Sequence, residues 1–456
     1  MTTIGLISLG CPRNLVDSEV MIGLLKKSGF RIAADISKCD AAVVNTCAFI
    51  EDAKKESVDL ILQLVQLKKE KKIKSIIVTG CLPQRYPREL RVELPEVDAF
   101  LGTGDFIELP QTIRKTLKGK SCDRISRVPS FLSDHTNQRG LITPFHFIYL
   151  KLSEGCNNRC TYCIIPRIRG KLRSRRINSL LTEVRGLSKK HKISEINLVG
   201  QDTTLYGTDL YQRPGLVKLL KKLTALKMAR WIRLLYTHPE HYTDDLIDII
   251  KNEPSICKYI DLPFQHINDR VLKSMNRKTT RKGIMGLIAR LKKQIPALAI
   301  RTTFIVGFPG ETEKEFDELV DFIKQTKFER LGIFEYSREE GTGAYNFKDQ
   351  IPDKIKKERF DTIMKLQQEV SRDINAGFIG KELEILIDEA DVIARSPEGA
   401  TKQSPVAYSY IGRTEYDAPE VDGNCFVRTK RRHKPGDFVK VKVTDTLEYD
   451  LTGEEI

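Results

Sequence analysis

Hydrophobic positions in the first 120 residues alternate between short apolar runs and stretches with helical spacing. The apolar runs lie at residues 4–9, 41–46 and 75–80, and the helical stretches at 18–30 and 51–70. This alternation predicts βαβ units, in which helices flank a parallel sheet. We therefore expect a doubly wound α/β domain over residues 1–120.

A second and longer series of the same kind follows a polar segment. Residues 121–141 show no clear period, so we expect a linker there. Between residues 142 and 376, helical patterns separate six strand patterns, near 147–152, 195–200, 231–237, 258–264, 299–307 and 330–337. Six βα units predict a parallel partial (β/α)6 barrel, two units short of the usual eight.

Residues 377–456 have a third pattern, with short strands broken by Gly, Pro and Asp. The strand patterns lie near 383–389, 425–430 and 437–446. They predict a small β-barrel of the OB-like kind. This part carries 11 basic and 16 acidic residues, a net charge of −5, whereas the whole chain has 76 basic and 61 acidic residues and a net charge of +15. A basic chain suits an anionic or nucleic-acid partner, but lysine-rich solvated helix faces give the same count.

Composition also bears on the compartment. Mean hydropathy is −0.32, and no apolar run approaches the ~18 residues of a membrane helix. The N-terminus has no basic region before its apolar stretch, unlike a signal peptide. We expect a cytoplasmic protein without membrane attachment. Its ten cysteines are then reduced, and closely spaced ones suggest metal binding or catalysis more than disulfides.

Three cysteines of the first part occupy equivalent positions. Cys11, Cys47 and Cys81 each follow a predicted strand. Parallel strands end on one edge of the sheet, where ligand sites form, so these cysteines are expected to converge. The alternative is that all three are buried as small apolar side chains.

Three more cysteines stand close together in CNNRCTYC, at positions 156, 160 and 163, directly after the first barrel strand. Zinc sites usually combine two short-spaced pairs. A triplet without a fourth partner nearby is typical of a 4Fe–4S cluster whose fourth iron is open to another ligand. Zinc binding and simple burial remain the alternatives.

This loop resembles the radical-SAM superfamily, with Cys156, Cys160 and Cys163 matching its cluster ligands. The resemblance implies that S-adenosylmethionine (SAM) binds the open iron and is cleaved to a 5′-deoxyadenosyl radical. It also implies that five residues contact SAM: Tyr162 near the adenine, Gly200 and Gln201 in LVGQD, and Gly307 and Glu311 in IVGFPGET. Considered alone, IVGFPGET is equally a turn that begins a helix with a glutamate in its first turn.

Other features have simpler interpretations. His238 and Gln265 also stand at predicted strand ends, but the HPEH sequence at 238–241 is interpreted as a turn before a Thr-capped helix. The basic run at 428–437 is either an RNA contact or, as we prefer, a charged hairpin. The remaining cysteines lack partners at useful spacing and are expected to be free thiols, namely Cys39, Cys122, Cys257 and Cys425.

The order of the three parts resembles the methylthiotransferases. That family implies a second 4Fe–4S cluster on Cys11, Cys47 and Cys81, and a C-terminal TRAM domain that recognises the substrate. SLGCPRNLVDSE (8–19) and GRTEYDAPEVDG (412–423) are similar to the RimO branch. This branch modifies an aspartate of small-subunit ribosomal protein S-twelve, either free or in the ribosomal subunit. An acidic C-terminal part suits a basic ribosomal protein better than RNA phosphates.

The implied reaction uses two SAM molecules. One methylates a sulfide on the cluster of Cys11, Cys47 and Cys81, and the other yields the radical that takes hydrogen from the aspartate β-carbon, which then captures the methylthio group. An electron donor such as flavodoxin or ferredoxin is also implied, and no catalytic residue is expected beyond the cluster ligands. One alternative is a tRNA adenosine methylthiotransferase, and another is a non-enzymatic Fe–S or zinc protein that binds RNA or senses redox state.

Overall fold

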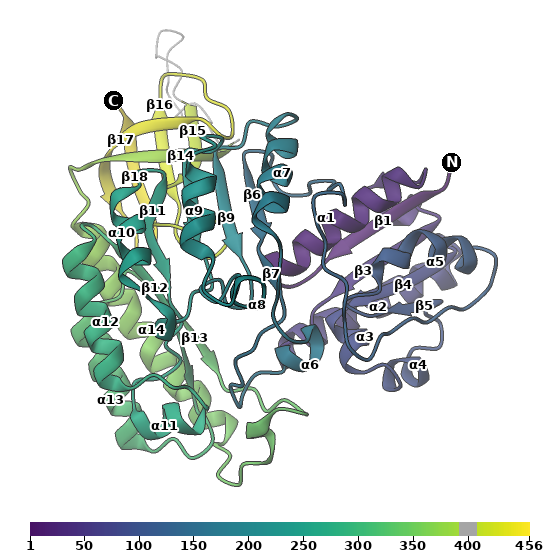
Figure 1. Ribbon diagram of the computed structural model, residues 1–456, viewed down its shortest axis with the longest axis horizontal. Coiled ribbons are helices and arrows are strands. Elements are labelled where there is room, and N and C mark those ends of the chain that lie inside the picture. Colours follow the sequence, from purple (N-terminus) through teal and green to yellow (C-terminus); the bar gives the residue numbers. More distant parts are fainter. Residues whose placement is uncertain (392–407) are drawn as a thin grey trace, which may run out of the picture.

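The computed structural model describes residues 1–391 and 408–456, which form three parts (Figure 1). The N-terminal part is a parallel sheet of five strands in the order β2-β1-β3-β4-β5. Its strands are β1 (Thr3–Ser8), β2 (Arg31–Ala33), β3 (Ala41–Thr46), β4 (Ser75–Gly80) and β5 (Ala99–Leu101). Its helices are α1 (Pro12–Lys27), η1 (Ile36–Lys38), α2 (Glu51–Lys69), α3 (Cys81–Arg85), α4 (Glu89–Glu93), η2 (Phe106–Glu108) and α5 (Leu109–Thr116).

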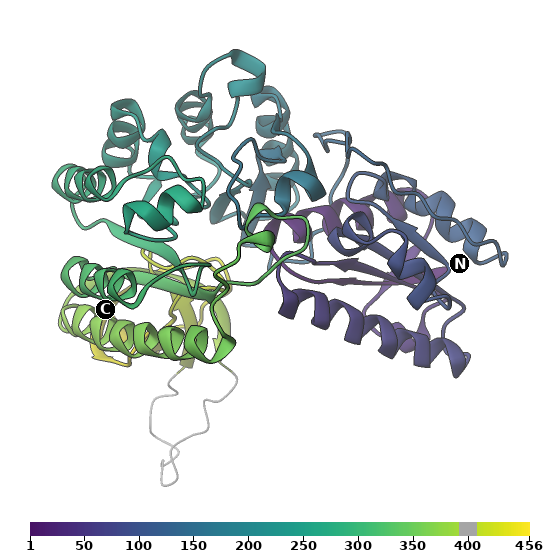
Figure 2. The ribbon, with the colours of Figure 1, turned by 90° about the horizontal axis from the view of Figure 1, so that it is seen from below.

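Helices cover both faces of this sheet (Figure 2). Alternate residues of one strand point to opposite faces, so Val44 in β3 packs toward α2 while its neighbour Val43 packs with α1 and α5. The two faces thus have separate hydrophobic clusters, and the predicted doubly wound α/β domain is confirmed. Strand order reverses between β1 and β3, the point where such sheets form ligand sites.

The central part is a six-stranded parallel sheet in the order β13-β12-β11-β10-β9-β6. Its strands are β6 (Phe147–Lys151), β9 (Glu195–Val199), β10 (Trp231–Leu234), β11 (Ile256–Asp261), β12 (Ala299–Val306) and β13 (Arg330–Glu335), and a small ribbon joins β7 (Ser153–Glu154) to β8 (Arg173–Ser174). Its helices are α6 (Ile165–Arg169), α7 (Ile177–Ser188), α8 (Thr208–Tyr211), α9 (Leu216–Thr224), η3 (Pro239–His241), α10 (Asp244–Asn252), α11 (Asp269–Ser274), α12 (Arg281–Gln294), α13 (Glu313–Thr326), η4 (Gly343–Asn346) and α14 (Asp353–Ala376). The predicted partial (β/α)6 barrel is confirmed.

The C-terminal part is a closed barrel of five strands in the order β14-β15-β16-β18-β17, as predicted. Its strands are β14 (Glu382–Asp391), β15 (Tyr408–Arg413), β16 (Cys425–Thr429), β17 (Phe438–Thr446) and β18 (Leu451–Glu455). The basic run 428–437 continues from β16 into the turn before β17, where His433 pairs with Glu455 at 2.9 Å.

A segment of this C-terminal part enters the large barrel. Between β15 and β16, Ala418 is fully buried in a cluster with Phe147 and Tyr259, whose side chains point into the large barrel. Asp417 accepts a hydrogen bond from Arg330 at 2.8 Å, and Asp422 accepts one from the Tyr259 hydroxyl at 2.7 Å. Residues 414–422 therefore line the interior of the barrel.

The predicted linker, residues 121–141, is irregular but packed. The Gly102 amide donates to the Arg124 carbonyl, and Arg139 is buried with Glu19 of α1 and Glu183 of α7. A stretch without apolar periodicity thus contributes a buried cation. The boundaries 120, 141 and 376 stay predictions, while α5 ends at Thr116 and α14 at Ala376.

A second buried group of charges joins the N-terminal part to the barrel. Arg169 pairs with Asp17 at 2.6 Å and with Glu154 at 3.1 Å, and Lys151 also pairs with both acids. Such charges are retained inside a protein only when they are mutually paired. The junction therefore fixes how α1 sits against β6. In the described residues, no helix is both long and apolar enough to cross a bilayer.

Candidate active site and its two cysteine triads

The first cysteine triad lies at the carboxyl edge of the N-terminal sheet. Cys11 follows β1 and precedes α1, Cys47 directly follows β3, and Cys81 is the first residue of α3 after β4. The three strands are neighbours in the sheet, so the cysteines at their carboxyl ends lie together, as predicted from their equivalent positions. We call them triad 1.

Glycines permit this convergence. Gly10 has φ +83°, and a Cβ there would lie 2.7 Å from the Cβ of Cys47 and 3.0 Å from its Sγ. Gly80 has φ +101°, and its Cβ would lie 2.5 Å from Asn45 Oδ1. Only glycine combines such backbone angles with so close an approach, so both turns bring the thiols together.

The acidities within triad 1 are uneven. Burial, and then the nearby Cys81 and Cys11, raise the pKa of Cys47 to about 12. Burial opposes ionisation of Cys11 as well, yet the charges of Arg13 and Arg169 lower its pKa below the usual value. Cationic neighbours favour the thiolate, which is the form that binds metal.

The second triad, Cys156, Cys160 and Cys163, lies in the loop between β7 and α6. Burial, followed by the charges of its partners, raises the pKa of Cys163 to about 12. The backbone of this loop is held at several points: Cys156 N donates to Gly170 O at 3.1 Å, and Thr161 N donates to Met275 O at 3.0 Å. We call these cysteines triad 2.

Triad 2 lines a cavity of about 450 Å³ to which all three parts of the chain contribute. Arg13 and Phe49 come from the N-terminal part, Tyr162 and Phe334 from the barrel, and Val421 from the C-terminal part. Phe49, Phe334 and Val421 are exposed by 39%, 51% and 54%. These three side chains, which we call the apolar rim, offer unpaired hydrophobic surface to a large partner.

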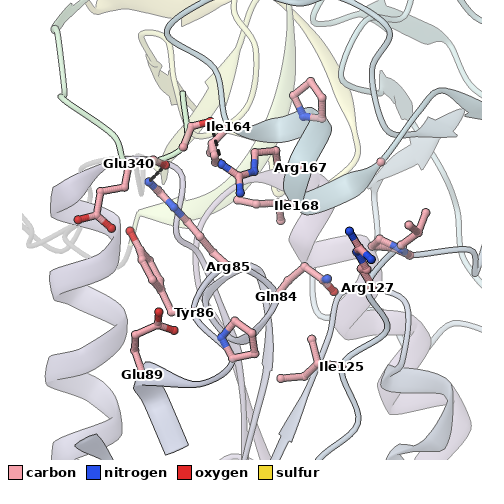
Figure 3. A pocket seen from close by; sticks show the side chains of 16 residues that line it. Gln84, Arg85, Tyr86, Glu89, Ile125, Arg127, Ile164, Arg167, Ile168 and Glu340 are labelled. Atoms are coloured by element: carbon pink, nitrogen blue, oxygen red, sulfur yellow. Dashed lines mark hydrogen bonds between the residues drawn. The ribbon is translucent and has the colours of Figure 1, made fainter. Parts of the chain in front are cut away.

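A larger cavity, of about 730 Å³, lies beside this one between α3 and α6 (Figure 3). Arg85 donates to Glu340 O at 3.0 Å and Arg167 donates to Gly341 O at 3.1 Å, as the dashed lines show. Arg85 also pairs with Glu339 at 2.7 Å. Among the described residues, no cysteine lines this larger cavity. We therefore place the candidate active site in the smaller cavity, which triad 2 lines. In the larger cavity, Arg85 of α3 holds the barrel loop at residues 339–341 against the N-terminal part, and Arg167 of α6 holds the same loop from the barrel side.

The residues expected to contact SAM separate into two groups. Tyr162 and Gln201 line the cavity of triad 2, as do His238 and Gln265. Gly200, Gly307 and Glu311 are not among its lining residues, although Gly200 O accepts a hydrogen bond from Arg13 at 3.1 Å. The roles of all five predicted contacts in SAM binding stay predictions.

Glu311 has a structural setting. Its carboxylate is fully buried, accepts a hydrogen bond from Arg359 of α14 at 2.8 Å and another from the Phe308 amide at 3.3 Å. Gly307 has φ +69°, and a Cβ there would lie 2.4 Å from Lys356 Cγ. Both residues thus shape the turn after β12, where α14 packs closely.

Sequence reasoning missed the partners of the triad 2 loop. Asn158 donates to Asp202 at 2.8 Å, and Asp202 lies 3.3 Å from His241 Nδ1. With His238, these side chains form a group that has the geometry to hold a metal ion. The HPEH sequence is a turn before a helix capped by Thr243, as predicted. The one signal in the sequence was Asn158 itself, a polar side chain within the cysteine loop that needs a hydrogen-bond partner.

The donors fit iron–sulfur clusters. Each triad offers three cysteine thiols at one edge of its sheet, and binding metal would relieve the burial cost that now keeps Cys47 and Cys163 protonated, because it ionises the thiol. All ten cysteines, the four outside the triads included, are free.

Comparison with known families divides the chain in the same three parts. Residues 3–102 match the Uncharacterized protein family UPF0004, residues 150–323 match the Radical SAM superfamily, and residues 379–456 match the TRAM domain. The last two matches agree with the resemblances found in the sequence.

Several curated proteins are similar over their whole length. The ribosomal protein uS12 methylthiotransferase RimO of Desulforamulus reducens is 48% identical over 456 residues, covering 100% of this chain and 99% of the relative. Its counterpart in Clostridioides difficile is 43% identical over 461 residues, covering 100% and 99%.

Among solved structures, the radical S-adenosylmethionine methyltransferase TsrM of Kitasatospora setae, with a tryptophan substrate and a SAM analogue bound, has a TM-score of 0.54 at 14% identity. The likeness covers 73% of each chain and concerns the fold.

Proposed function

The chain belongs to the RimO family of ribosomal protein uS12 methylthiotransferases, and we propose that it attaches a methylthio group to the β-carbon of an aspartate in uS12. One observation carries this proposal on the structural side. Neighbours of triad 1 and all of triad 2 border one cavity, so groups held by the two triads can reach one substrate.

The enzyme uses SAM and an iron–sulfur cluster, as the Radical SAM superfamily does. We assign this cluster to Cys156, Cys160 and Cys163, and a second one to Cys11, Cys47 and Cys81. When bound, the cluster on triad 2 supplies the electron for reductive SAM cleavage, and the cluster on triad 1 supplies the sulfur to be transferred.

The chain's own residues position these groups. Asn158 and Asp202 hold the triad 2 loop at the barrel mouth. Tyr162 and Gln201 face the cavity and are the proposed SAM contacts with the most direct access. Gly200, Gly307 and Glu311 act through the backbone turns after β9 and β12. The buried pairing of Asp17 with Arg169 keeps triad 1 facing the barrel.

The substrate is uS12, whose target loop we place against the apolar rim. Phe49, Phe334 and Val421 belong to different parts of the chain, so one loop inserted there touches all three. We further propose that the substrate is recognised free or in the ribosomal subunit, and that flavodoxin or ferredoxin is the reductant.

The structure changes one argument for a protein substrate. The acidic C-terminal part was expected to attract a basic protein, but Asp417 and Asp422 face Arg330 and Arg301 inside the barrel. Asp388 is likewise paired with Arg413. These acids are neutralised within the chain, so the case for uS12 rests on the full-length relatives.

Mass spectrometry tests the proposal. uS12 from cells that lack this chain should lose the methylthio mass shift, and wild-type protein should restore it. A variant with Cys156, Cys160 and Cys163 replaced by alanine should not. If uS12 were unmodified in wild-type cells while tRNA lost a methylthioadenosine in the deletion strain, the tRNA alternative would hold instead.

A further inference from the structure

We propose that Arg13 binds the carboxylate of the target aspartate and thereby places its β-carbon between the two triads. This inference rests on the proposed function, because it takes an aspartate of uS12 as the substrate. It assigns a substrate-binding role to a residue outside both cysteine triads.

Arg13 spans the junction between the N-terminal part and the barrel. It lies in the first turn of α1, and its Nε lies 3.4 Å from the Sγ of Cys11 in triad 1. Its Nη1 donates to Gly200 O, just after β9, at 3.1 Å. Its guanidinium stands 4.4 Å from the ring centre of Tyr236, just after β10. The side chain therefore reaches from one triad to the mouth of the barrel.

Arg13 is placed close to both triads. Its Nε lies 3.4 Å from the Sγ of Cys11, a member of triad 1. Arg13 also lines the cavity that contains triad 2. It is thus a cation placed beside both reacting centres.

The reaction creates a need for such a cation. Bond changes occur at the aspartate β-carbon, so the carboxylate is not consumed and stays ionised within the cavity. An unpaired carboxylate in a water-poor site is costly, whereas a guanidinium binds it in a fixed two-point geometry. A carboxylate held in this way leaves the adjacent β-carbon little freedom.

The cavity contains two other arginines. Arg301 lies between two carboxylates, Asp261 and Asp422, each at 3.3 Å. Arg277 donates to Pro263 O at 2.8 Å and to the Tyr162 hydroxyl, on the triad 2 loop. Within the described part of the chain, neither Arg277 nor Arg13 forms an ion pair with a carboxylate, but of these two only Arg13 contacts a triad 1 cysteine as well as the barrel. Position therefore favours Arg13 as the group that binds a carboxylate between the triads.

Binding measurements separate this role from others. Reconstituted protein with SAM, kept without reductant so that no turnover occurs, is titrated with uS12 and with uS12 in which the target aspartate is asparagine. Wild-type protein should bind the aspartate form about tenfold more tightly, the value of one charge-assisted contact. Arg13→Gln should lose this preference, Arg13→Lys should retain part of it, and Arg127→Gln, an exposed arginine of the other cavity, should leave it unchanged.

The outcomes are distinct. If Arg13→Gln kept the tenfold preference, or weakened binding of both forms equally, Arg13 would not bind the carboxylate. If wild-type protein bound neither form, the proposed function itself would fail. Iron content and the electron paramagnetic resonance spectrum of each variant show whether the clusters survive. If Arg13→Gln lost a cluster, Arg13→Lys would decide: a reduced preference with clusters intact would support a two-point contact, and an undiminished preference would overturn it.

Discussion

Nη1 of Arg169, in the barrel, lies 2.6 Å from Oδ2 of Asp17, in helix α1 of the N-terminal part, and both side chains are almost fully buried. The same guanidinium stands 3.6 Å from the Sγ of Cys81. One arginine thus ties the junction between the two parts to a triad 1 thiol, so the docking of the parts and the setting of the cysteine depend on the same group.

Replacing Asp17 with Asn should destabilise the protein strongly. Among the residues that the structure describes, it leaves Arg169 and Lys151 with only Glu154 as an ion-pair partner, and breaking a buried pair typically costs about 3–5 kcal/mol. Denaturant unfolding measures the loss. Asp361→Asn on α14, whose pair with Lys357 is more than half exposed, should cost less than about 1 kcal/mol. Equal losses of unfolding free energy in the two variants would show that the buried junction does not stabilise the protein more than a surface ion pair does.

Substitutions in the two triads should affect different steps of the reaction. Alanine at Cys11, Cys47 and Cys81 should remove about half of the reconstituted iron and abolish methylthiolation, but leave reductive SAM cleavage, because triad 2 is intact. Alanine at triad 2 should abolish cleavage. Iron assay and detection of 5′-deoxyadenosine measure these effects. Methylthiolated product from the first variant would exclude a role for triad 1 in sulfur transfer.

The apolar rim should matter for substrate binding alone. Phe334→Ala should raise the KM for uS12 about fivefold or more, since we expect Phe334 to be one of the few aromatic anchor residues whose truncation at an interface costs more than about 1 kcal/mol. SAM cleavage without substrate should be unaffected. Val92→Ala, at an exposed residue of α4 outside the cavity, is the matched control. A kcat effect without a KM effect would contradict this placement.

Gly307 should not tolerate alanine. At φ +69° a side chain is strained, and its Cβ would lie 2.4 Å from Lys356 Cγ, so Gly307→Ala should destabilise by about 1–3 kcal/mol. Gly286→Ala, inside α12 with nothing within 4 Å of the new Cβ, should be neutral or stabilising by up to about 1 kcal/mol. Thermal unfolding compares them, and a neutral Gly307→Ala would mean that α14 adjusts freely.

Two glutamates at the start of α13 should respond to pH in opposite ways. Burial raises the pKa of Glu311 to about 7, so its contribution to stability is complete below about 4.5 and is lost as pH rises through 7. A hydrogen bond from Arg270 lowers the pKa of Glu315 to about 2, so its contribution is present above about 4.5 and is lost as pH falls toward 2. Unfolding midpoints of Glu311→Gln and Glu315→Gln, measured against wild type across this range, should therefore diverge in opposite directions. Parallel profiles would refute this assignment.

Strand patterns predicted all three folds because apolar periodicity is a local property of the chain. The same logic located both triads, since a residue directly after a parallel strand must lie at the ligand-binding edge. Arg13 was passed over because its neighbours, Cys11, Gly200 and Tyr236, meet only when two separate parts dock. Nothing local distinguishes it from a solvated arginine.

Charge was the least predictive feature. Counting acids in residues 377–456 could not show that Asp417 and Asp422 face arginines inside the barrel. The partner of Glu311 was equally beyond reach, because the carboxylate accepts a hydrogen bond from Arg359, 48 residues later; its contact with SAM stays a prediction. Such ion pairs join residues that are far apart in the sequence, so no periodic pattern along the chain reveals them.

The insertion of residues 414–422 into the large barrel also restricts how such enzymes can diversify. Glu195 on β9 pairs with Arg413 at 2.8 Å, and Tyr149 on β6 donates to Glu420 at 2.8 Å, so polar contacts join this segment to the large barrel. A chimaera that took its C-terminal part from a distant homologue would leave buried charges without their partners in both barrels. An exchange of the C-terminal part should therefore succeed only when its partners in the large barrel, such as Glu195 and Arg330, are exchanged with it.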